Sequence, residues 1–250
     1  MNADSSIIVD VRNISKRYGN LDVLTNVVFK VKRSEFIVIV GPSGCGKTTI
    51  LKIIAGLENP SSGFVLINGK PPNPRFQNIG YVFQENSLFP WRTVEENVRF
   101  GLEIKRLNAE NKVREMINLL GLTGFEHYYP SQISGGMRKR TAIARALAVN
   151  PSLLLMDEPF GDLDAQTRWI MHKELWLIHE KLKITTVFVT HNVEEAVYLA
   201  DDVVVLTKRP GTVKRVIPIE LQRPRNKLSR QFIEYREMII ELLREEVPSI

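Results

Sequence analysis

Gly41-Pro42-Ser43-Gly44-Cys45-Gly46-Lys47-Thr48 is the stretch of sequence that decides the fold. It matches the phosphate-binding loop pattern at every fixed position. The apolar, β-branched run at 36–40 before it predicts a buried strand, and the apolar spacing of 49–56 after it predicts a helix. A strand that leads through a glycine-rich turn into a helix aims backbone N–H groups at one point, where the helix N-terminus adds partial positive charge. The sequence therefore predicts a phosphate-binding site in this loop.

The residue types of the loop suit a nucleoside triphosphate with Mg²⁺. Gly44 and Gly46 have no Cβ, so the backbone can wrap closely around phosphates. Lys47 is placed to reach the β- and γ-phosphates, and the Thr48 hydroxyl is placed to ligate Mg²⁺. The alternative, a glycine-rich turn with a solvated lysine, is disfavoured because both flanks fit. The predicted nucleotide contacts in this segment are Gly41, Pro42, Ser43, Gly44, Cys45, Gly46, Lys47, Thr48 and Thr49.

The composition is that of a globular protein, with 250 residues of which 44% are hydrophobic and 25% are charged. No apolar run is long enough to span a bilayer, and the N-terminus lacks the features of a secretion signal. The single cysteine, Cys45, excludes an internal disulfide and favours a reducing cytoplasm. The net charge of +6 accompanies a concentration of basic residues between 208 and 230. We interpret these as a solvated surface rather than a site for anionic lipid or nucleic acid, so we expect no nucleic-acid partner.

The order of the predicted elements indicates an α/β fold. Turn signals separate strands in the first third, a helical pattern runs from Thr93 to about Asn150, and strand–helix alternation follows Pro151. Such alternation predicts a mainly parallel sheet with helices on its faces, into which the helical block is inserted. The expected strands are 7–12, 23–31, 35–40, 63–67, 79–84, 153–156, 185–189 and 203–206, and the expected helices of the last part are 165–182 and 192–200.

We predict one domain over residues 1–250, with a phosphate-loop NTPase core. The core, together with an N-terminal antiparallel β subdomain, takes residues 1–90 and 151–211, and an inserted α-helical subdomain takes 91–150. A short C-terminal strand and helix fill 212–250, with the helix over 228–246. Within the helical part, Thr93 and Glu96 form a capping-box signature, and a later helix begins near Ser134.

Two carboxylates follow the apolar strand predicted at 153–156. Because ligands of open α/β sheets bind at the carboxyl ends of the strands, we expect Asp157 and Glu158 beside the phosphate loop. Asp157 suits a Mg²⁺ ligand, and Glu158 suits a general base that orients or deprotonates the attacking water. An ordinary strand end is the structural alternative, which the presence of the phosphate loop disfavours.

Ser134-Gly135-Gly136 precedes a predicted helix with one apolar face. Ser134 is a favourable N-cap, and the two glycines leave the helix N-terminus open to an anion. The segment is therefore a second candidate phosphate contact. A plain glycine-rich helix cap fits the same residues equally well.

Three further side chains complete the candidate site. His191 follows the strand at 185–189, where an imidazole can hydrogen-bond a γ-phosphate oxygen or the attacking water. Gln84 ends the strand at 79–84 and offers an amide to Mg²⁺ or to water. Tyr18 offers a flat ring that can stack on a base. Each of these residue types also has a common structural role, so their value lies in their positions.

In this order, the motifs resemble those of the ATP-binding cassette (ABC) ATPase family, over residues 18–211. The resemblance rests on the phosphate loop, Gln84, Ser134-Gly135-Gly136, Asp157-Glu158, Leu163-Asp164 and His191. It implies a head-to-tail homodimer, in which each of two ATP molecules lies between the phosphate loop of one subunit and Ser134, Gly135 and Gly136 of the other. It also implies that Glu158 is the catalytic base, His191 the γ-phosphate sensor and Asp164 part of a loop that crosses between the subunits.

A finer resemblance, to the ATPase subunits of nitrate/sulfonate/taurine-type importers, rests on the segments 89–94, 135–138, 160–164 and 208–211. It implies that hydrolysis of ATP to ADP and phosphate drives uptake of a small, anionic solute. The implied partners are two membrane permease subunits and, indirectly, an extracytoplasmic solute-binding protein, with this chain peripheral on the cytoplasmic face of the cell membrane. Phe89 and Trp91 would then lie in the groove that receives a permease helix, although a core role fits them as well.

The chain departs from the broad family pattern at Ile133, Met137, Gly161-Asp162 and Asn192, none of which removes a group assigned to the chemistry. Two other functions stay open. A soluble ABC ATPase of the DNA-repair type is disfavoured because the chain has no sustained heptads, whereas an iron–sulfur assembly type fits the same motifs. A phosphate-loop kinase acting on a small molecule is disfavoured by the Ser-Gly-Gly segment.

Overall fold

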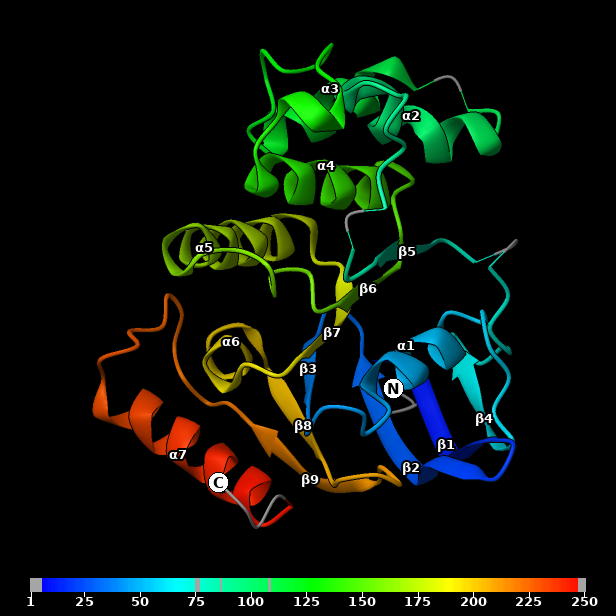
Figure 1. The fold of residues 1–250 in the computed structure, drawn as a ribbon, viewed down its shortest axis with the longest axis vertical. Coiled ribbons are helices and arrows are strands. Elements are labelled where there is room, and N and C mark those ends of the chain that lie inside the picture. Colours follow the sequence, from blue (N-terminus) through cyan, green and yellow to red (C-terminus); the bar gives the residue numbers. More distant parts are fainter. Residues whose placement is uncertain (1–5, 75–76, 86, 108, 247–250) are drawn as a thin grey trace. The chain divides into compact units, whose positions relative to one another are not determined.

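The computed structural model describes residues 6–74, 77–85, 87–107 and 109–246. The chain forms two compact units (Figure 1). The first unit comprises residues 1–77 and 183–250, and the second comprises residues 78–182. The subdomain boundaries predicted from the sequence, near residues 90 and 150, both fall within the second unit. This finer division of the chain stays a prediction.

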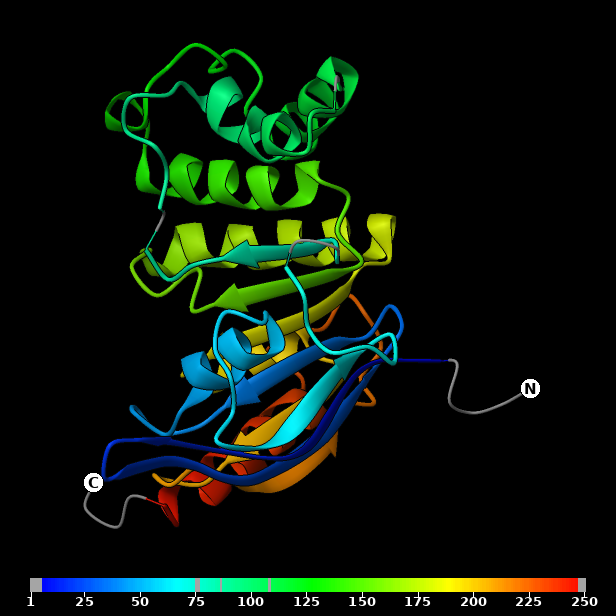
Figure 2. The same cartoon turned by 90° about the vertical axis from the view of Figure 1, so that its right-hand side faces the viewer.

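The first unit contains an antiparallel sheet of three strands in the order β2-β1-β4, namely β1 (Ile7–Tyr18), β2 (Leu21–Lys32) and β4 (Ser62–Ile67). They lie side by side as the blue and cyan arrows of Figure 2. The strand expected at 7–12 continues to Tyr18, so its predicted end is wrong. Register shifts interrupt the pairing between Val11 and Ile14, where Asn13 has a φ of 50°. Such bulges break the simple alternation from which strand ends are predicted.

The first unit also contains the strands β3 (Phe36–Val40), β7 (Thr185–Thr190), β8 (Asp202–Leu206) and β9 (Val213–Pro218). They adopt the order β7-β3-β8-β9, in which β3 is parallel to both β7 and β8, and β9 is antiparallel to β8. Every residue of β3 and β7 is buried. Strands that are buried on both faces are rich in apolar and β-branched residues, as β3 and β7 are, which explains why their positions could be predicted.

Three helices accompany these strands, α1 (Lys47–Ile54), α6 (Val193–Leu199) and α7 (Arg230–Arg244). The helix α6 contacts β3 and β7, and α7 contacts β8. The helix α1 contacts β4 of the antiparallel sheet and β7 of the parallel strands. The phosphate loop therefore ends in a helix that is packed between the two kinds of sheet.

The second unit contains the parallel strands β5 (Ile79–Val82) and β6 (Leu153–Asp157) and the helices α2 (Val94–Ile104), α3 (Glu110–Leu119), η2 (Pro130–Gln132), α4 (Gly135–Ala148) and α5 (Ala165–Leu182). The green helices α2, α3 and α4 contact one another (Figure 1). The capping box is confirmed, because Thr93 Oγ1 accepts from the N–H of Glu96 at 3.3 Å and Glu96 Oε2 accepts from the N–H of Thr93 at 2.7 Å. The strand at 79–84 is shorter than predicted and ends at Val82, so Gln84 lies beyond it.

The predicted fold class is thus confirmed in its parts: a mainly parallel set of strands, an antiparallel β subdomain and a group of helices between β5 and β6. Throughout the described residues, no helix combines the length and the apolar character that a membrane crossing requires. The C-terminal strand and helix lie at Val213–Pro218 and Arg230–Arg244, close to their predicted positions.

Glu35, directly before β3, is a buried carboxyl with an altered pKa. Glu35 is 8% exposed, and its Oε2 accepts a hydrogen bond from the N–H of Lys32 at 2.6 Å. Burial raises its pKa to about 7, and the carboxyl of Asp202 adds to this effect. In the unfolded chain the pKa returns to the ordinary value of 4.5. Stability from this group is therefore complete below about pH 4.5 and is lost as the pH rises through about 7.

We expect Glu35→Gln to stabilise the protein at high pH. At pH 8 its free energy of unfolding should exceed that of the parental protein by about 1–3 kcal/mol, because the variant has no buried charge to accommodate. The difference should shrink toward zero as the pH falls to 5. Urea unfolding at a series of pH values measures it, and a difference that does not change with pH would contradict the assignment.

Candidate nucleotide-binding site

The phosphate loop has the backbone conformation that its sequence predicts. Gly46 is the N-cap of α1 with a φ of 102°, and Gly44 has a φ of 75°, both in the region that favours glycine. No side chain caps the N-terminus of α1, and its first turn contains no acidic residue. The start of α1 therefore presents its partial positive charge without an internal counter-charge, which suits an anionic ligand.

Neighbouring residues pack closely against the phosphate loop. A Cβ on Gly41 would lie 2.7 Å from Cys45 Sγ, and a Cβ on Gly46 would lie 2.5 Å from Leu24 Cδ2. A Cβ on Gly211 would lie 2.1 Å from the carbonyl oxygen of Cys45. Gly211 is itself held, because its N–H donates to the Val23 carbonyl at 2.8 Å. The sequence of segment 208–211 indicates only a family resemblance, whereas the structure shows that Gly211 packs against the phosphate loop.

Lys47 and Tyr18 both lie at the first turn of α1. Lys47 is 6% exposed, and its Nζ donates to the carbonyls of Gly41 at 2.9 Å and Pro42 at 3.1 Å, so the ammonium lies within the loop. The pKa of Tyr18 is raised by partial burial and by a hydrogen bond with Glu58, while a hydrogen bond with Thr49 acts in the opposite direction. Tyr18 therefore lies beside the first turn of α1, and its ring is 43% exposed, as stacking on a base requires.

His191 emerges from the sheet beside the phosphate loop. Thr190 pairs with Val40 in the parallel register of β7 and β3, so His191 and Gly41 follow neighbouring strand ends. Thr190 Oγ1 donates to Glu195 Oε2 at 2.5 Å and accepts from the N–H of Asn192 at 3.0 Å. Asn192 in turn caps α6 through Oδ1. The backbone on both sides of His191 is thus fixed, next to the strand end from which the phosphate loop begins, and its role toward the γ-phosphate stays a prediction.

Arg225 holds the helix that follows His191. Only 6% of Arg225 is exposed, and its guanidinium donates to the carbonyls of Val197, Tyr198 and Ala200 at the end of α6. Burial lowers its pKa to about 10. The interpretation of the basic C-terminal region as a solvated surface is therefore wrong for Arg225. A long cation next to Pro224 gives no sequence signal that separates a buried helix cap from a surface residue.

In the second unit, β6 ends in the two predicted carboxylates. Asp157 is the last residue of the strand and is 4% exposed, whereas Glu158 is half-buried. The pKa of Tyr81 is raised by burial and by the charge of Asp157, so the phenol and this carboxylate are neighbours. Glu158 has a φ of 42°, a left-handed conformation that is strained for a residue with a Cβ. Strain of this kind concentrates at functional sites, which supports the candidate role of Glu158.

The Ser-Gly-Gly segment and Asp164 form two helix starts in the same unit. Ser134 is the N-cap of α4, and its Oγ accepts from the N–H of Met137 at 3.2 Å, so the departure at Met137 keeps this backbone contact. Asp164 Oδ1 accepts from the N–H groups of Gln166 at 3.0 Å and Thr167 at 2.9 Å at the start of α5. These bonds, led by that from Thr167, lower the pKa of Asp164.

Gln84 is exposed, and its backbone is held by a residue that the sequence analysis missed. Lys139 of α4 is 1% exposed, and its Nζ donates to the Gln84 carbonyl at 2.7 Å. A signal was available in the sequence. Residues 139, 142, 143 and 146 share one face of a helix, and three of the four are apolar, so helical periodicity places Lys139 on the buried face.

The candidate residues divide between the two units. The first unit brings together Tyr18, the phosphate loop through Thr49, and His191. The second unit contains Gln84, Ser134, Gly135, Gly136, Asp157, Glu158 and Asp164. Of the predicted metal ligands, Thr48 belongs to the first unit, and Gln84 and Asp157 belong to the second.

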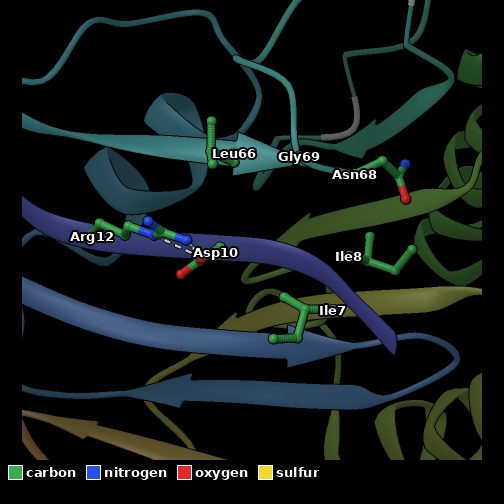
Figure 3. Close-up of a pocket in the computed structure, with 7 residues that line it drawn as sticks. All are labelled: Ile7, Ile8, Asp10, Arg12, Leu66, Asn68 and Gly69. Carbon is green, nitrogen blue, oxygen red and sulfur yellow. Dashed lines mark hydrogen bonds and ion pairs between the residues drawn. The ribbon is translucent and has the colours of Figure 1, made fainter. Parts of the chain in front are cut away.

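One cavity of the first unit is lined by residues outside the phosphate loop. It has a volume of about 430 Å³, and Figure 3 shows the residues that line it, Ile7, Ile8, Asp10, Arg12, Leu66, Asn68 and Gly69. Asp10 and Arg12 form an ion pair there, with Arg12 Nη2 at 2.6 Å from Asp10 Oδ2. None of the predicted nucleotide contacts lines this cavity. The cavity and the phosphate loop are therefore separate features.

Comparison with known proteins decides the family. A family model described as ABC transporter matches residues 24–161. The chain belongs to the ABC transporter family. This match covers the phosphate loop, Gln84, the Ser-Gly-Gly segment and both carboxylates after β6. As an ABC ATPase, the chain hydrolyses ATP to ADP and phosphate.

Curated relatives match along nearly the whole chain. An uncharacterized ABC transporter ATP-binding protein of Methanocaldococcus jannaschii is 50% identical over 244 residues, which cover 95% of this chain and 91% of the relative. An aliphatic sulfonates import ATP-binding protein of Bacillus thuringiensis is 45% identical over 227 residues, which cover 91% of this chain and 90% of the relative. The resemblance to importer ATPases that the motifs indicate is thereby confirmed at the level of the ATPase subunit.

Solved structures of ABC ATPases share the fold. A dimeric ATP-binding cassette in a post-hydrolysis state, bound to ADP and Pi, is 33% identical with a TM-score of 0.75, and the match covers 86% of this chain and 100% of that one. The cbiO1 protein of Clostridium perfringens, part of an ABC transporter complex, is 25% identical with a TM-score of 0.78, over 97% of this chain and 96% of the other. The ABC ATPase fold predicted from the motifs is confirmed.

The predicted metal ligands of the ABC ATPase are oxygen donors. The carboxylate of Asp157, the hydroxyl of Thr48 and the amide of Gln84 are oxygen donors, which Mg²⁺ prefers. Among the described residues, no group of three or more His, Cys, Asp or Glu side chains lies close enough together to hold a metal ion. Taken singly, these donors fit Mg²⁺, an ion that usually takes one or two protein carboxylates and completes its ligands with water or substrate phosphates.

Proposed function

We propose that this ABC ATPase powers an importer, in which a homodimer of the chain works with two separate membrane permease subunits on the cytoplasmic face of the membrane. The solute we propose is a small anion of the sulfonate class, delivered to the permease by an extracytoplasmic binding protein. The observation that carries the proposal is the 45% identity, over 91% of the chain, to an aliphatic sulfonates import ATP-binding protein.

The proposed chemistry is binding, orientation and proton transfer by the chain's own groups. The backbone of the phosphate loop and Lys47 hold the phosphates, and Tyr18 stacks on the base. Thr48, Gln84 and Asp157 would hold Mg²⁺, which would supply positive charge to the nucleotide phosphates. Glu158 orients the attacking water and accepts its proton, and His191 donates a hydrogen bond to the γ-phosphate. Positioning and charge neutralisation supply most of the rate enhancement in phosphoryl transfer of this kind.

The proposed homodimer places two helix N-termini on one nucleotide. The starts of α1 and α4 are each preceded by glycine-rich or small residues, and each is the kind of helix terminus that binds anions. In support, a solved relative is a dimeric cassette bound to ADP and Pi. We propose that α1 acts within its own subunit, and that Ser134, Gly135 and Gly136 at α4 act on the ATP of the other, with Asp164 in the crossing loop.

We expect Ser134→Arg to prevent ATP-dependent dimerisation without preventing ATP binding. Because the phosphate loop of each chain stays intact, the variant should bind ATP with an affinity within about twofold of the parental protein. Light scattering in the Glu158→Gln background should show a dimer with ATP for the background variant and a monomer for the combined variant. Thr123→Arg, at an exposed position of the same unit, is the matched control and should dimerise. A Ser134→Arg chain that dimerises and hydrolyses ATP normally would contradict the shared site.

The proposed permease contact is an aromatic cluster at the start of α2, formed by Phe89, Trp91 and Phe100. Phe89 packs at a tilt against Phe100, with ring centroids 4.4 Å apart, and against Trp91, with centroids 5.6 Å apart. Trp91 is 71% exposed, so most of its surface is available to a partner. Large exposed aromatic residues are enriched at protein interfaces, which favours the docking role for Trp91 over the core role.

We expect Trp91→Ala to weaken assembly with the permease by about tenfold or more, as loss of an exposed aromatic anchor does. The ATPase activity of the isolated chain should stay unchanged. Co-purification with the permease subunits, and stimulation of ATP hydrolysis by binding protein loaded with ethanesulfonate, measure the two properties. Stimulation by nitrate alone would contradict the sulfonate class, and a soluble iron–sulfur assembly protein as the co-purifying partner would contradict the importer.

A further inference from the structure

Lys139 is a buried cation within the second unit. It lies on α4, one turn after the Ser-Gly-Gly segment, and is 1% exposed. Its Nζ donates to the Gln84 carbonyl at 2.7 Å and lies 3.0 Å from Asp162 Oδ1. One ammonium therefore contacts the segment that carries Gln84 and the loop at 158–164 that carries Glu158 and Asp164.

The two ends of this ion pair have very different surroundings. The Lys139 side chain is 1% exposed, whereas the Asp162 side chain is 63% exposed. An ammonium without a counter-ion is costly to bury, because the protein interior solvates charge far less well than water. A carboxylate at the surface pays little to approach it. The balance therefore favours the conformation in which the loop at 158–164 is drawn onto α4.

Packing and hydrogen bonds also hold this loop: Phe160 is fully buried with its ring centroid 5.5 Å from that of His172, and the Arg168 guanidinium donates to the Leu163 carbonyl at 2.6 Å. The backbone bonds within it are from Gly161 N–H to the Glu158 carbonyl at 3.3 Å and from Leu163 N–H to the Phe160 carbonyl at 3.2 Å. Glu158 is held in a left-handed conformation with a φ of 42°. A strained residue keeps its conformation only where the surrounding structure fixes it. The ion pair supplies such a constraint four residues after Glu158.

We propose that Lys139 and Asp162 are positioning residues for ATP hydrolysis, which fix the loop at 158–164 relative to Gln84 and the start of α4. This proposal rests on the proposed roles of Glu158 and Gln84. The pair sets the turnover rate and leaves ATP affinity unchanged, because the phosphate loop and Lys47 belong to the other unit. Asp162 stands at one of the positions where this chain departs from the broad family pattern, and Lys139 is the cation that the departure pairs with.

The test compares single and double charge removals at the pair. Asp162→Asn keeps the side-chain shape and leaves the Lys139 ammonium buried without its counter-ion. It should lower kcat about five- to tenfold, with the KM for ATP within about twofold of the parental value. Asp162→Asn combined with Lys139→Gln should recover most of kcat, because a neutral amide needs no counter-ion and can still donate to the Gln84 carbonyl. Asp162→Glu should also retain activity.

Glu115→Gln is the matched control. It removes a carboxylate from an exposed ion pair of the same unit, with Lys112 at 3.0 Å, and should leave kcat unchanged. Asp162→Asn with parental kcat would overturn the proposal, as would a double variant in which the two losses simply multiply. Because Asp162 is at the surface, its variants test the pair even where Lys139→Gln alone does not fold. A different result would contradict the proposed chemistry on which this inference rests, namely a Glu158→Gln protein that hydrolyses ATP at the parental rate.

Discussion

Glu158→Gln is expected to reduce kcat for ATP hydrolysis by about 10²–10⁴-fold, the contribution typical of a positioned general base. The amide keeps the shape of the side chain but cannot accept a proton from water. Nucleotide affinity should stay close to the parental value, because Lys47 and the phosphate loop are unchanged. The measurements are release of phosphate under saturating ATP and equilibrium binding of ATP.

The position of Glu158 in the structure is what makes this the largest expected loss. It follows the last residue of β6 and stands one position after Asp157, so its side chain takes a different direction from the buried carboxylate. Its left-handed backbone, with a φ of 42°, is a conformation that costs free energy for a residue with a Cβ. Both features are expected of a residue whose side chain must reach a defined point.

The control for this prediction is a carboxylate of similar size outside the site, and Glu115→Gln serves again. It should hydrolyse ATP at the parental rate. A Glu158→Gln protein that turns over as fast as this control would remove Glu158 from the role of base. Loss of ATP binding together with loss of turnover would instead mean that Glu158 supports the binding of the nucleotide.

Gly211→Ala is expected to weaken ATP binding by about 10- to 100-fold, as overpacking by a single methyl group in a rigid site does. The added Cβ would lie 2.1 Å from the carbonyl oxygen of Cys45, and therefore far inside van der Waals contact. Gly211 cannot withdraw easily, since its N–H donates to Val23 and its carbonyl accepts from Thr25 at 3.0 Å. The phosphate loop must move instead, and its N–H groups lose their common direction.

The matched control is Gly69→Ala, at a turn after β4 with a φ of 73° and no atom within 4 Å of the added Cβ. This change also introduces strain into the first unit, but it leaves the phosphate loop alone. It should lower the free energy of unfolding slightly and keep ATP affinity. Equal ATP affinity for Gly211→Ala and the parental protein would show that the loop tolerates the methyl group, which contradicts the prediction.

Local sequence determined much of this protein. The phosphate loop, the capping box at Thr93 and the N-cap at Ser134 are contiguous motifs whose geometry follows from a few neighbouring residues, and the structure contains all three. The buried strands β3 and β6 are mostly apolar runs, and β7 is a short run of β-branched and aromatic residues, so the local pattern located all three. The strand ends at Tyr18 and Val82 were missed because bulges and loop entry depend on pairing with distant strands.

Only the tertiary structure decided the surroundings of single residues. Arg225 and Glu35 are ionisable groups that the sequence presents like any surface charge, yet each is more than nine-tenths buried. Helical periodicity places Lys139 on a buried face, but only the structure shows that its ammonium meets the Gln84 carbonyl and Asp162. Gly211 is an ordinary loop glycine until the Cys45 carbonyl is found within reach of a Cβ. The physical reason is that burial, counter-ions and close backbone approach arise between residues far apart in the chain. Motif and periodicity describe what neighbours along the chain do, and they carry no information about which distant groups will meet.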